Sequence, residues 1–225
     1  MPEILVRASN LQRSYQSGRS EVLAVRSATF QLREDERVAL VGPSGSGKTT
    51  ILHLVAGLDE PTNGSIEWPA LGPAERLRPG PVSVAFQGPS LLPPLSVIEN
   101  VELPLLLLEA EEDEAHERAV YLLDRFGLAN VTDKLPEEIS GGQAQRAGLA
   151  RALSARPRLV LADEPTGQQD GEGGREVITA LLDAADHEGF ALLVATHDLR
   201  VAERLDARWS IRDGVLDDGV VASSL

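Results

Sequence analysis

The amino-acid sequence contains no cysteine, which excludes disulfide bonds, cysteine-ligated zinc and thiol catalysis. Long hydrophobic runs are also missing. The strongest apolar candidate, residues 103–108, contains Pro104 and is far shorter than the roughly 20 residues that cross a bilayer. Residues 1–7 lack the charged and apolar regions of a signal peptide. We therefore expect a soluble chain.

Basic residues are scarce as well. The chain has 21 Lys and Arg against 35 Asp and Glu, which gives a formal net charge of −14. This balance disfavours a general nucleic-acid binder, because a phosphate backbone demands clustered Lys and Arg, and it disfavours direct binding to an anionic membrane surface. The length of 225 residues and the 42% hydrophobic content suit one large globular domain, or a domain with a subdomain.

The most informative run in the sequence, residues 42–49, matches the pattern G-x-x-x-x-G-K-[ST] at every fixed position. It lies between a predicted strand at 37–41 and a predicted helix at 50–56. Glycines let backbone N–H groups close around phosphate oxygens, and the helix N-terminus adds partial positive charge. Lys48 is expected to reach the β- and γ-phosphates, and the Thr49 hydroxyl to ligate Mg²⁺. A glycine-rich loop with a chance lysine is the weaker alternative. The residues expected to contact the nucleotide here are Gly42, Pro43, Ser44, Gly45, Ser46, Gly47, Lys48, Thr49 and Thr50.

A second site lies at the end of another apolar strand, predicted at 158–162. Asp163 and Glu164 follow this strand, at the edge of an open α/β sheet where ligands bind. Asp163 is expected to hold Mg²⁺, which prefers oxygen ligands, and Glu164 to act as general base on the attacking water. The alternative is a solvated acidic pair, which the intact glycine loop makes the weaker interpretation.

The wider pattern alternates strands and helices, which predicts a mainly parallel sheet covered by helices. Further strands are predicted at 4–6, 22–32, 65–68, 82–86 and 190–195, with short antiparallel strands between 207 and 221. Further helices are predicted at 144–154 and 173–185, and residues 115–126 have one apolar helical face. Residues 69–81, which are rich in Pro and Gly, are expected to form a loop.

The run at 139–143 adds a third phosphate-binding candidate. Ser140 is a good N-cap for the helix predicted behind it, and the exposed amides at such a helix start suit a phosphate. An ordinary capped helix is the alternative. The run resembles the signature Leu-Ser-Gly-Gly-Gln of the ATP-binding-cassette (ABC) ATPases, with Ile139 in place of leucine. The residues that match the signature are Ser140, Gly141, Gly142 and Gln143.

Four single residues match this family in order and spacing, although each match alone is weak evidence for the family. The resemblance implies that Gln87 contacts Mg²⁺ and senses a membrane partner. It also implies that His197 contacts the γ-phosphate and that Tyr15 stacks on adenine. Asp170 matches the D-loop aspartate, which belongs to the nucleotide site where two copies meet. Taken alone, Tyr15 has the alternative of a core tyrosine, and His197 has the alternative of a structural histidine.

The resemblance implies an α/β fold with a P-loop NTPase core and a mainly parallel sheet. It also implies an N-terminal antiparallel β subdomain and an inserted α-helical subdomain at about 97–155, all within a single domain over 1–225. A narrower likeness is to the ATPases of lipoprotein release, macrolide efflux and peptide export. It rests on the runs at 53–59, 99–105 and 162–167. The D-loop departs from the family, because Gln169 replaces an apolar residue.

The implied function is an ATP-binding and ATP-hydrolysing subunit that powers an ABC transporter, an exporter or extractor, through a separately encoded transmembrane permease. ATP and Mg²⁺ are the expected ligands, and a second copy is the expected partner in an ATP-sandwich dimer, with no nucleic acid. The expected location is cytoplasmic, on the inner face of the cell membrane through the permease. The alternative is a mechanical signalling ATPase coupled to a permease-like partner that transports nothing. A soluble cassette ATPase acting on DNA or ribosomes is disfavoured, because the chain has neither a coiled-coil insert nor a second cassette.

Overall fold

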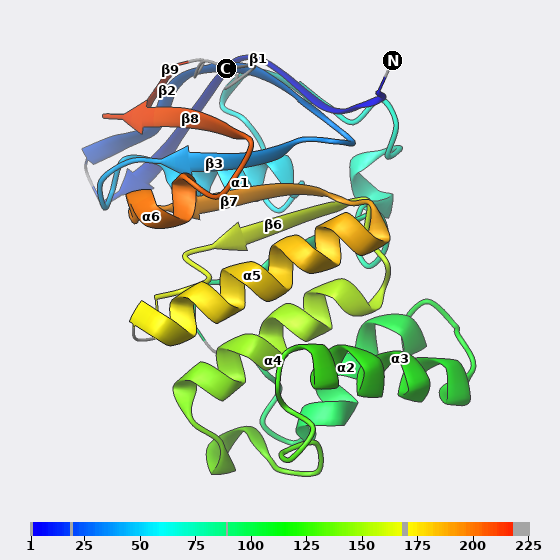
Figure 1. Ribbon diagram of the computed structural model, residues 1–225. Helices are drawn as coiled ribbons and strands as arrows, with labels where there is room; N and C mark the ends of the chain where they lie inside the picture. The colour runs from blue at the N-terminus through cyan, green and yellow to red at the C-terminus, as the bar shows by residue number, and fades with distance from the viewer. Residues whose placement is uncertain (1, 19, 89, 168–170, 218–225) are drawn as a thin grey trace. The chain divides into compact units, whose positions relative to one another are not determined.

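The computed structural model describes the chain apart from residues 1, 19, 89, 168–170 and 218–225 (Figure 1). Contacts divide the chain into two compact units, residues 1–77 with 191–225 and residues 78–190. Each is described by itself. The expected helical block at 97–155 lies inside the second unit, which also contains strands and a further helix on either side of it.

In the first unit, three strands near the N-terminus pair antiparallel, with β1 between the other two. They are β1 (Ile4–Ser17), β2 (Ser20–Arg33) and β4 (Asn63–Glu67). The predicted strand at 4–6 is therefore too short. Residues 8–16 carry many polar side chains and no clean alternation, but β2 and β4 bond to them from both sides and extend the strand. This confirms the antiparallel N-terminal region.

The buried part of the same unit is parallel. Strand β3 (Arg37–Val41) pairs in parallel with β7 (Ala191–Thr196) on one side and β8 (Ala207–Arg212) on the other. All six residues of β7 are buried, as expected for a continuous apolar run in a parallel sheet. β9 (Val215–Asp217) returns antiparallel to β8 through a turn at Asp213 and Gly214, which confirms the predicted hairpin. Helices α1 (Lys48–Val55) and α6 (Leu199–Ala202) pack against β7.

The second unit combines two parallel strands with helices (Figure 1). Helices α2, α3 and α4 pack against one another, and α4 also contacts α5 and β5. The elements are β5 (Val82–Ala85), α2 (Val97–Leu106), α3 (Glu112–Arg125), a 3-10 turn at Pro136–Glu138, α4 (Gly141–Ser154), β6 (Leu159–Asp163) and α5 (Gly171–Glu188). The apolar face predicted for α3 is buried at Ala115, Ala119, Leu122 and Leu123, as expected.

Two local predictions are corrected. The strand expected to reach Phe86 ends at Ala85, because the ladder to β6 ends there, and Phe86 is 41% exposed. The loop expected at 69–81 contains a short 3-10 helix, Ala74–Arg76, after which Leu77 is fully buried. In the described part of the chain, no helix has the length and apolar character needed to span a membrane.

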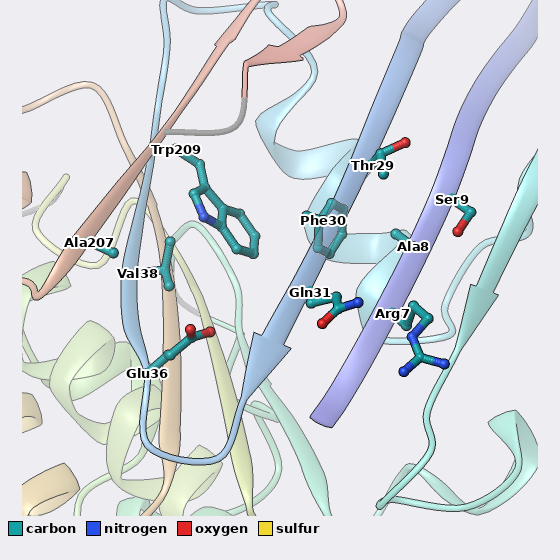
Figure 2. Close-up of a pocket in the computed structure, with 10 residues that line it drawn as sticks. All are labelled: Arg7, Ala8, Ser9, Thr29, Phe30, Gln31, Glu36, Val38, Ala207 and Trp209. Carbon is teal, nitrogen blue, oxygen red and sulfur yellow. The ribbon is translucent and has the colours of Figure 1, made fainter. Parts of the chain in front are cut away.

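A cavity of about 410 Å³ lies in the first unit between the ends of β2 and β8 (Figure 2). Phe30 and Trp209 line it with their rings tilted and the ring centroids 4.8 Å apart, and Arg7 and Glu36 line it as well. Glu36 directly precedes β3, whereas the glycine-rich loop directly follows β3. The cavity is therefore at the opposite end of this strand from the phosphate-binding loop and is not the predicted nucleotide site.

Candidate functional site

The glycine-rich loop joins β3 to α1, and its backbone requires glycine at two positions. A Cβ added at Gly42 would lie 2.3 Å from the carbonyl oxygen of Ile211, which no side chain allows. Gly47, the residue before α1, has φ +107°, and a Cβ there would lie 2.5 Å from the carbonyl oxygen of Ala24. The loop therefore brings its backbone amides to the start of α1, where the partial positive charge of the helix favours an anion.

The Lys48 side chain is hydrogen-bonded to the glycine-rich loop. Its side chain is only 7% exposed, and Nζ donates hydrogen bonds to the carbonyl oxygens of Gly42 (2.8 Å) and Pro43 (3.1 Å). The backbone N–H of Ser46 also donates to the carbonyl of Pro43 (3.2 Å). A buried ammonium beside exposed loop amides makes this point of an acidic chain locally positive, while the Thr49 side chain is exposed at the first turn of α1.

His197 lies at the same edge of the first unit's sheet as this loop. Val41 of β3 pairs with Thr196 of β7 in a parallel ladder, so Gly42 and His197 leave neighbouring strand ends together. Ligands of open α/β sheets bind at this edge. Asp198 then caps α6 by accepting a hydrogen bond from the N–H of Arg200. The exposed His197 imidazole thus projects from a turn that the neighbouring residues fix.

Tyr15, predicted to stack on adenine, is anchored by two residues that the sequence analysis did not single out. Its phenol donates to Oδ2 of Asp59 (2.6 Å), and the Arg13 guanidinium lies 4.7 Å from the centre of its ring. Arg13 also donates from Nε to Oδ2 of Asp59 (2.9 Å). One face of the ring is therefore covered by the Arg13 cation, and Tyr15 is 37% exposed. Asp59 lies inside the run at 53–59, but nothing in that run indicates a partner in β1.

The electrostatics of this cluster favour ionised Asp59. Burial is the largest single influence and raises the pKa of its carboxyl, but the hydrogen bonds from Tyr15 and the Glu60 amide, together with the charge and hydrogen bond of Arg13, outweigh it. The pKa of Asp59 is therefore below its ordinary value. In turn, the pKa of Arg13 is raised, with its interaction with Tyr15 the largest cause.

In the second unit, Asp163 and Glu164 lie at the end of β6, a strand whose residues are all buried. Asp163 is 5% exposed and Glu164 is 8% exposed. Ala85 of β5 pairs in parallel with Ala162 of β6, so the predicted Gln87 leaves the sheet at the same edge as the two carboxylates. The Gln87 side chain itself is exposed.

Glu164 has an unusual backbone. Its φ is +46°, in the left-handed region that residues with a Cβ seldom adopt. Its carbonyl oxygen accepts hydrogen bonds from Nε2 of Gln145 (3.1 Å) and from the N–H of Gly167 (3.0 Å). Gln145 is a residue of α4 that the sequence analysis did not include. Its partner is 19 residues further along the chain, so no local pattern identifies the contact.

The signature run forms the expected capped helix start. Ser140 is the N-cap of α4, and its Oγ accepts from the N–H of Gln143 (3.2 Å) while Oε1 of Gln143 accepts from the N–H of Ser140 (2.9 Å). This reciprocal pair orients the first turn of α4, at which Ser140 and Gly141 are exposed. The D-loop residues Gln168, Gln169 and Asp170 lie outside the described residues, so the predicted role of Asp170 stays a prediction.

The segment after Gln87 is held by a buried asparagine. Asn100 is fully buried, and its amide donates to the carbonyls of Leu92, Leu95 and Ser96, while its Oδ1 accepts from the N–H of Leu92 (2.7 Å). Arg151 of α4 also fixes this segment, because it donates hydrogen bonds to both the carbonyl and the hydroxyl of Ser90. The loop that contains Gln87 is therefore attached both to α2 and to the signature helix.

This geometry defines a class of protein. A parallel sheet whose ligand edge carries a glycine-rich loop, a buried lysine and the start of a helix is that of a P-loop nucleotide-binding protein. The ABC transporter family model matches residues 25–167, and the chain belongs to that family. It binds and hydrolyses ATP as the ATPase of an ABC transporter, as the sequence predicted.

Relatives of the whole chain agree with this assignment. The chain is 40% identical over 221 residues to the lipoprotein-releasing system ATP-binding protein LolD of Hydrogenovibrio crunogenus, covering 95% of this chain and 96% of the relative. It is 38% identical to LolD of Idiomarina loihiensis, covering 96% and 98%. These matches confirm the narrower resemblance to the lipoprotein-release group.

Solved structures give the same fold. A dimer of the ATP-binding cassette MJ0796 in a post-hydrolysis state, bound to ADP and Pi, superposes with a TM-score of 0.89 at 31% identity and covers 98% of this chain and 100% of its own. The cbiO1 subunit of Clostridium perfringens, part of the transporter complex cbiONQ, superposes with a TM-score of 0.84 at 24% identity, covering 97% and 89%, and supports the fold alone. The predicted α/β class with antiparallel N-terminal strands is therefore confirmed.

Proposed function

We propose that this ATPase hydrolyses Mg·ATP between two copies of itself and drives the release of lipoproteins through a transmembrane partner. The observation that carries the proposal is the glycine-rich loop with its buried Lys48, in a chain that is similar along nearly its whole length to lipoprotein-releasing ATP-binding proteins. The signature helix, which Ser140 caps, supplies a second helix N-terminus that binds the phosphates of the same nucleotide.

The roles follow from the chemistry of each group. Lys48 and the loop amides bind the phosphates, and Tyr15 stacks on adenine with the ring face opposite Arg13. Glu164 takes a proton from the water that attacks the γ-phosphorus, and His197 donates a hydrogen bond to the γ-phosphate. The bond from this phosphorus to the bridging oxygen breaks, which yields ADP and phosphate.

The residue types expected to hold magnesium suit the chemistry of that ion. The Thr49 hydroxyl, the Asp163 carboxylate and the Gln87 amide oxygen are all hard oxygen donors, and Mg²⁺ typically takes only one or two protein ligands together with phosphate oxygens and water. When bound, the ion neutralises charge on the β- and γ-phosphates. The buried position of Asp163, 5% exposed at the end of an apolar strand, is consistent with a carboxylate kept for a cation.

The nucleotide links the two copies. Amides at Ser140 to Gly142 of one copy complete the shell around the γ-phosphate held by Lys48 of the other, so the closed dimer is favoured only while the triphosphate is intact. Hydrolysis removes that bridging charge and the pair loosens. In this proposal the segment after Gln87, which Asn100 ties to α2, carries this movement to the membrane partner, and the ATPase works at the inner face of the membrane.

A first experiment tests the catalytic assignment. Lys48→Ala is expected to abolish Mg²⁺-dependent phosphate release and to weaken ATP binding strongly, because it removes the buried cation of the loop. Lys134→Ala, at the only other lysine of the sequence and an exposed one, is the matched control and is expected to behave as wild type. An unchanged hydrolysis rate in Lys48→Ala refutes the site.

A second experiment tests the dimer. Glu164→Gln keeps the size and polarity of the side chain but cannot accept the proton, so it is expected to bind ATP, hydrolyse it slowly and accumulate as a dimer. Size-exclusion chromatography with light scattering, with and without Mg·ATP, measures this. A monomer under both conditions contradicts the two-copy mechanism.

The transport step separates the proposal from its alternative. In vesicles that contain the co-purified membrane partner, lipoprotein release that requires ATP and fails with Glu164→Gln supports transport. ATP hydrolysis that is coupled to the partner without release of any lipoprotein supports the mechanical signalling ATPase instead.

A further inference from the structure

The backbone of Glu164 changes direction at the end of a strand. Strand β6 ends at Asp163, and the next residue turns into the left-handed region with φ +46°. In a continued strand, successive side chains point to opposite faces, so Glu164 would point away from the face of Asp163. The left-handed turn replaces that alternation, and the direction of the Glu164 side chain therefore depends on how the peptide group that contains its carbonyl oxygen is held.

Two hydrogen bonds hold that peptide group. The N–H of Gly167 donates to the Glu164 carbonyl from within the same turn (3.0 Å), and Nε2 of Gln145 donates to it from α4 (3.1 Å). Gln145 is only 4% exposed, so this is a buried contact with little competition from water. An uncommon φ persists only where the surroundings over-determine it, and the buried hydrogen bond from Gln145 is one of the contacts that hold the backbone here.

The position of Gln145 on α4 gives the contact a consequence. Gly141 begins the helix, and Gln145 lies about one turn further along. The same helix therefore presents the signature amides at its first turn and donates a hydrogen bond to the Glu164 carbonyl one turn later. The two groups are rigidly spaced within one copy.

We propose that Gln145 is a positioning residue for the general base: it holds the Glu164 carbonyl so that the carboxylate is aimed at the attacking water, and it ties that aim to the signature helix of the same copy. The inference rests on the role of Glu164 proposed above. It predicts that loss of the Gln145 amide slows the chemical step and leaves nucleotide affinity unchanged.

The test uses two variants that lack the donor but differ in size, Gln145→Met and Gln145→Ala. Each is expected to lower kcat for ATP hydrolysis by about tenfold to a hundredfold, the range for a catalytic group misplaced by about 1 Å. The dissociation constant for ATP is expected to stay within about twofold. Affinity is measured with a fluorescent ATP analogue and kcat by release of phosphate, with full-length protein.

A matched control separates positioning from general loosening of α4. Ser154 is fully buried near the end of the same helix, and its hydroxyl donates to the carbonyl of Arg151 (2.9 Å). Ser154→Ala therefore also removes a buried side-chain donor to a backbone carbonyl. It is expected to lower the melting temperature as Gln145→Met does and to leave kcat unchanged. A similar fall of kcat in Ser154→Ala overturns the proposal.

The decisive measurement is a double-mutant cycle. If Gln145 acts through Glu164, Gln145→Met has no further effect on the slow hydrolysis that remains in Glu164→Gln, which is followed in single-turnover reactions over hours. An undiminished effect in that background shows that Gln145 acts elsewhere and overturns the inference, as does a kcat within twofold of wild type in either Gln145 variant. A Glu164→Gln protein with full activity instead refutes the general base, which is the failure of the proposed function itself.

Discussion

Replacing Asn100 with alanine is expected to destabilise the protein by more than any surface change. The wild-type amide makes five hydrogen bonds: three to carbonyl oxygens, one from the N–H of Leu92 and a longer one from Nη1 of Arg151 (3.5 Å), and the residue is fully buried. Alanine removes this partner from four backbone groups, of which the carbonyls of Leu92 and Ser96 keep hydrogen bonds from the N–H groups of Leu95 and Asn100. A buried polar group that loses its partner costs about 1–3 kcal/mol, so full burial of all four would imply a very large loss.

The expected magnitude is smaller, because the segment is close to solvent. Leu92 is 43% exposed, and Leu95 and Ser96 are half-buried, so water reaches part of the freed groups. We expect a loss of about 3 kcal/mol, which corresponds mainly to the lost bonds of the Leu92 N–H and the Leu95 carbonyl. For a chain of this length, 1 kcal/mol shifts Tm by about 2–4 °C, so the expected fall is about 6–12 °C.

Differential scanning calorimetry measures this shift, and Ser96→Ala is the matched control. Ser96 caps the same helix through a reciprocal pair with Glu99, and the loss of such a cap typically costs about 1 kcal/mol. Asn100→Ala must therefore lower Tm by clearly more than Ser96→Ala. An equal or smaller shift refutes the reasoning, because it shows that the segment after Gln87 is not held by the buried amide.

The cluster around Tyr15 gives the remaining predictions. Tyr15→Phe keeps a ring for stacking but loses the bond to Asp59, so it is expected to weaken ATP binding by less than tenfold and to leave binding of inorganic tripolyphosphate unchanged in titration calorimetry; an equal loss for both ligands contradicts the stacking role. Asp59→Asn is expected to cost about 1 kcal/mol at neutral pH, since the ion pair is partly exposed. Because the folded-state pKa of Asp59 is lowered, its contribution is present above about pH 4, the ordinary value, and is lost as the pH falls through the folded pKa. Urea unfolding from pH 3 to 7 checks this, and a gap between variant and wild type that widens toward low pH contradicts it.

Much of the site could be predicted from the sequence, because its geometry is local. The glycines at 42 and 47 are required by the backbone on which they sit, and Lys48 follows them directly into α1. The capping box at Ser140 needs only a serine followed three residues later by a glutamine. Each of these signals lies within one turn of the chain, so a linear pattern describes it.

The full length of β1 could not be predicted in this way. Residues 8–16 have no strand-like alternation, and their extended conformation comes from pairing with β2 and β4. Propensity and pattern are weak guides when bonds from two neighbouring strands supply the order. The short 3-10 helix in the expected loop at 69–81 is likewise set by packing, since it leads to the fully buried Leu77.

The amino-acid sequence by itself therefore determined the chemistry of this protein: a phosphate-binding loop, two carboxylates at the end of a buried strand, and a capped signature helix. Only the tertiary structure decided how these groups are aimed. Asp59 reaches Tyr15 across 44 residues, and Gln145 reaches the carbonyl of Glu164 across 19. Such contacts depend on which distant segments meet in the folded chain, and a short-range sequence pattern does not contain that information. The residues that hold Tyr15 and Glu164 are therefore identified only from the tertiary structure.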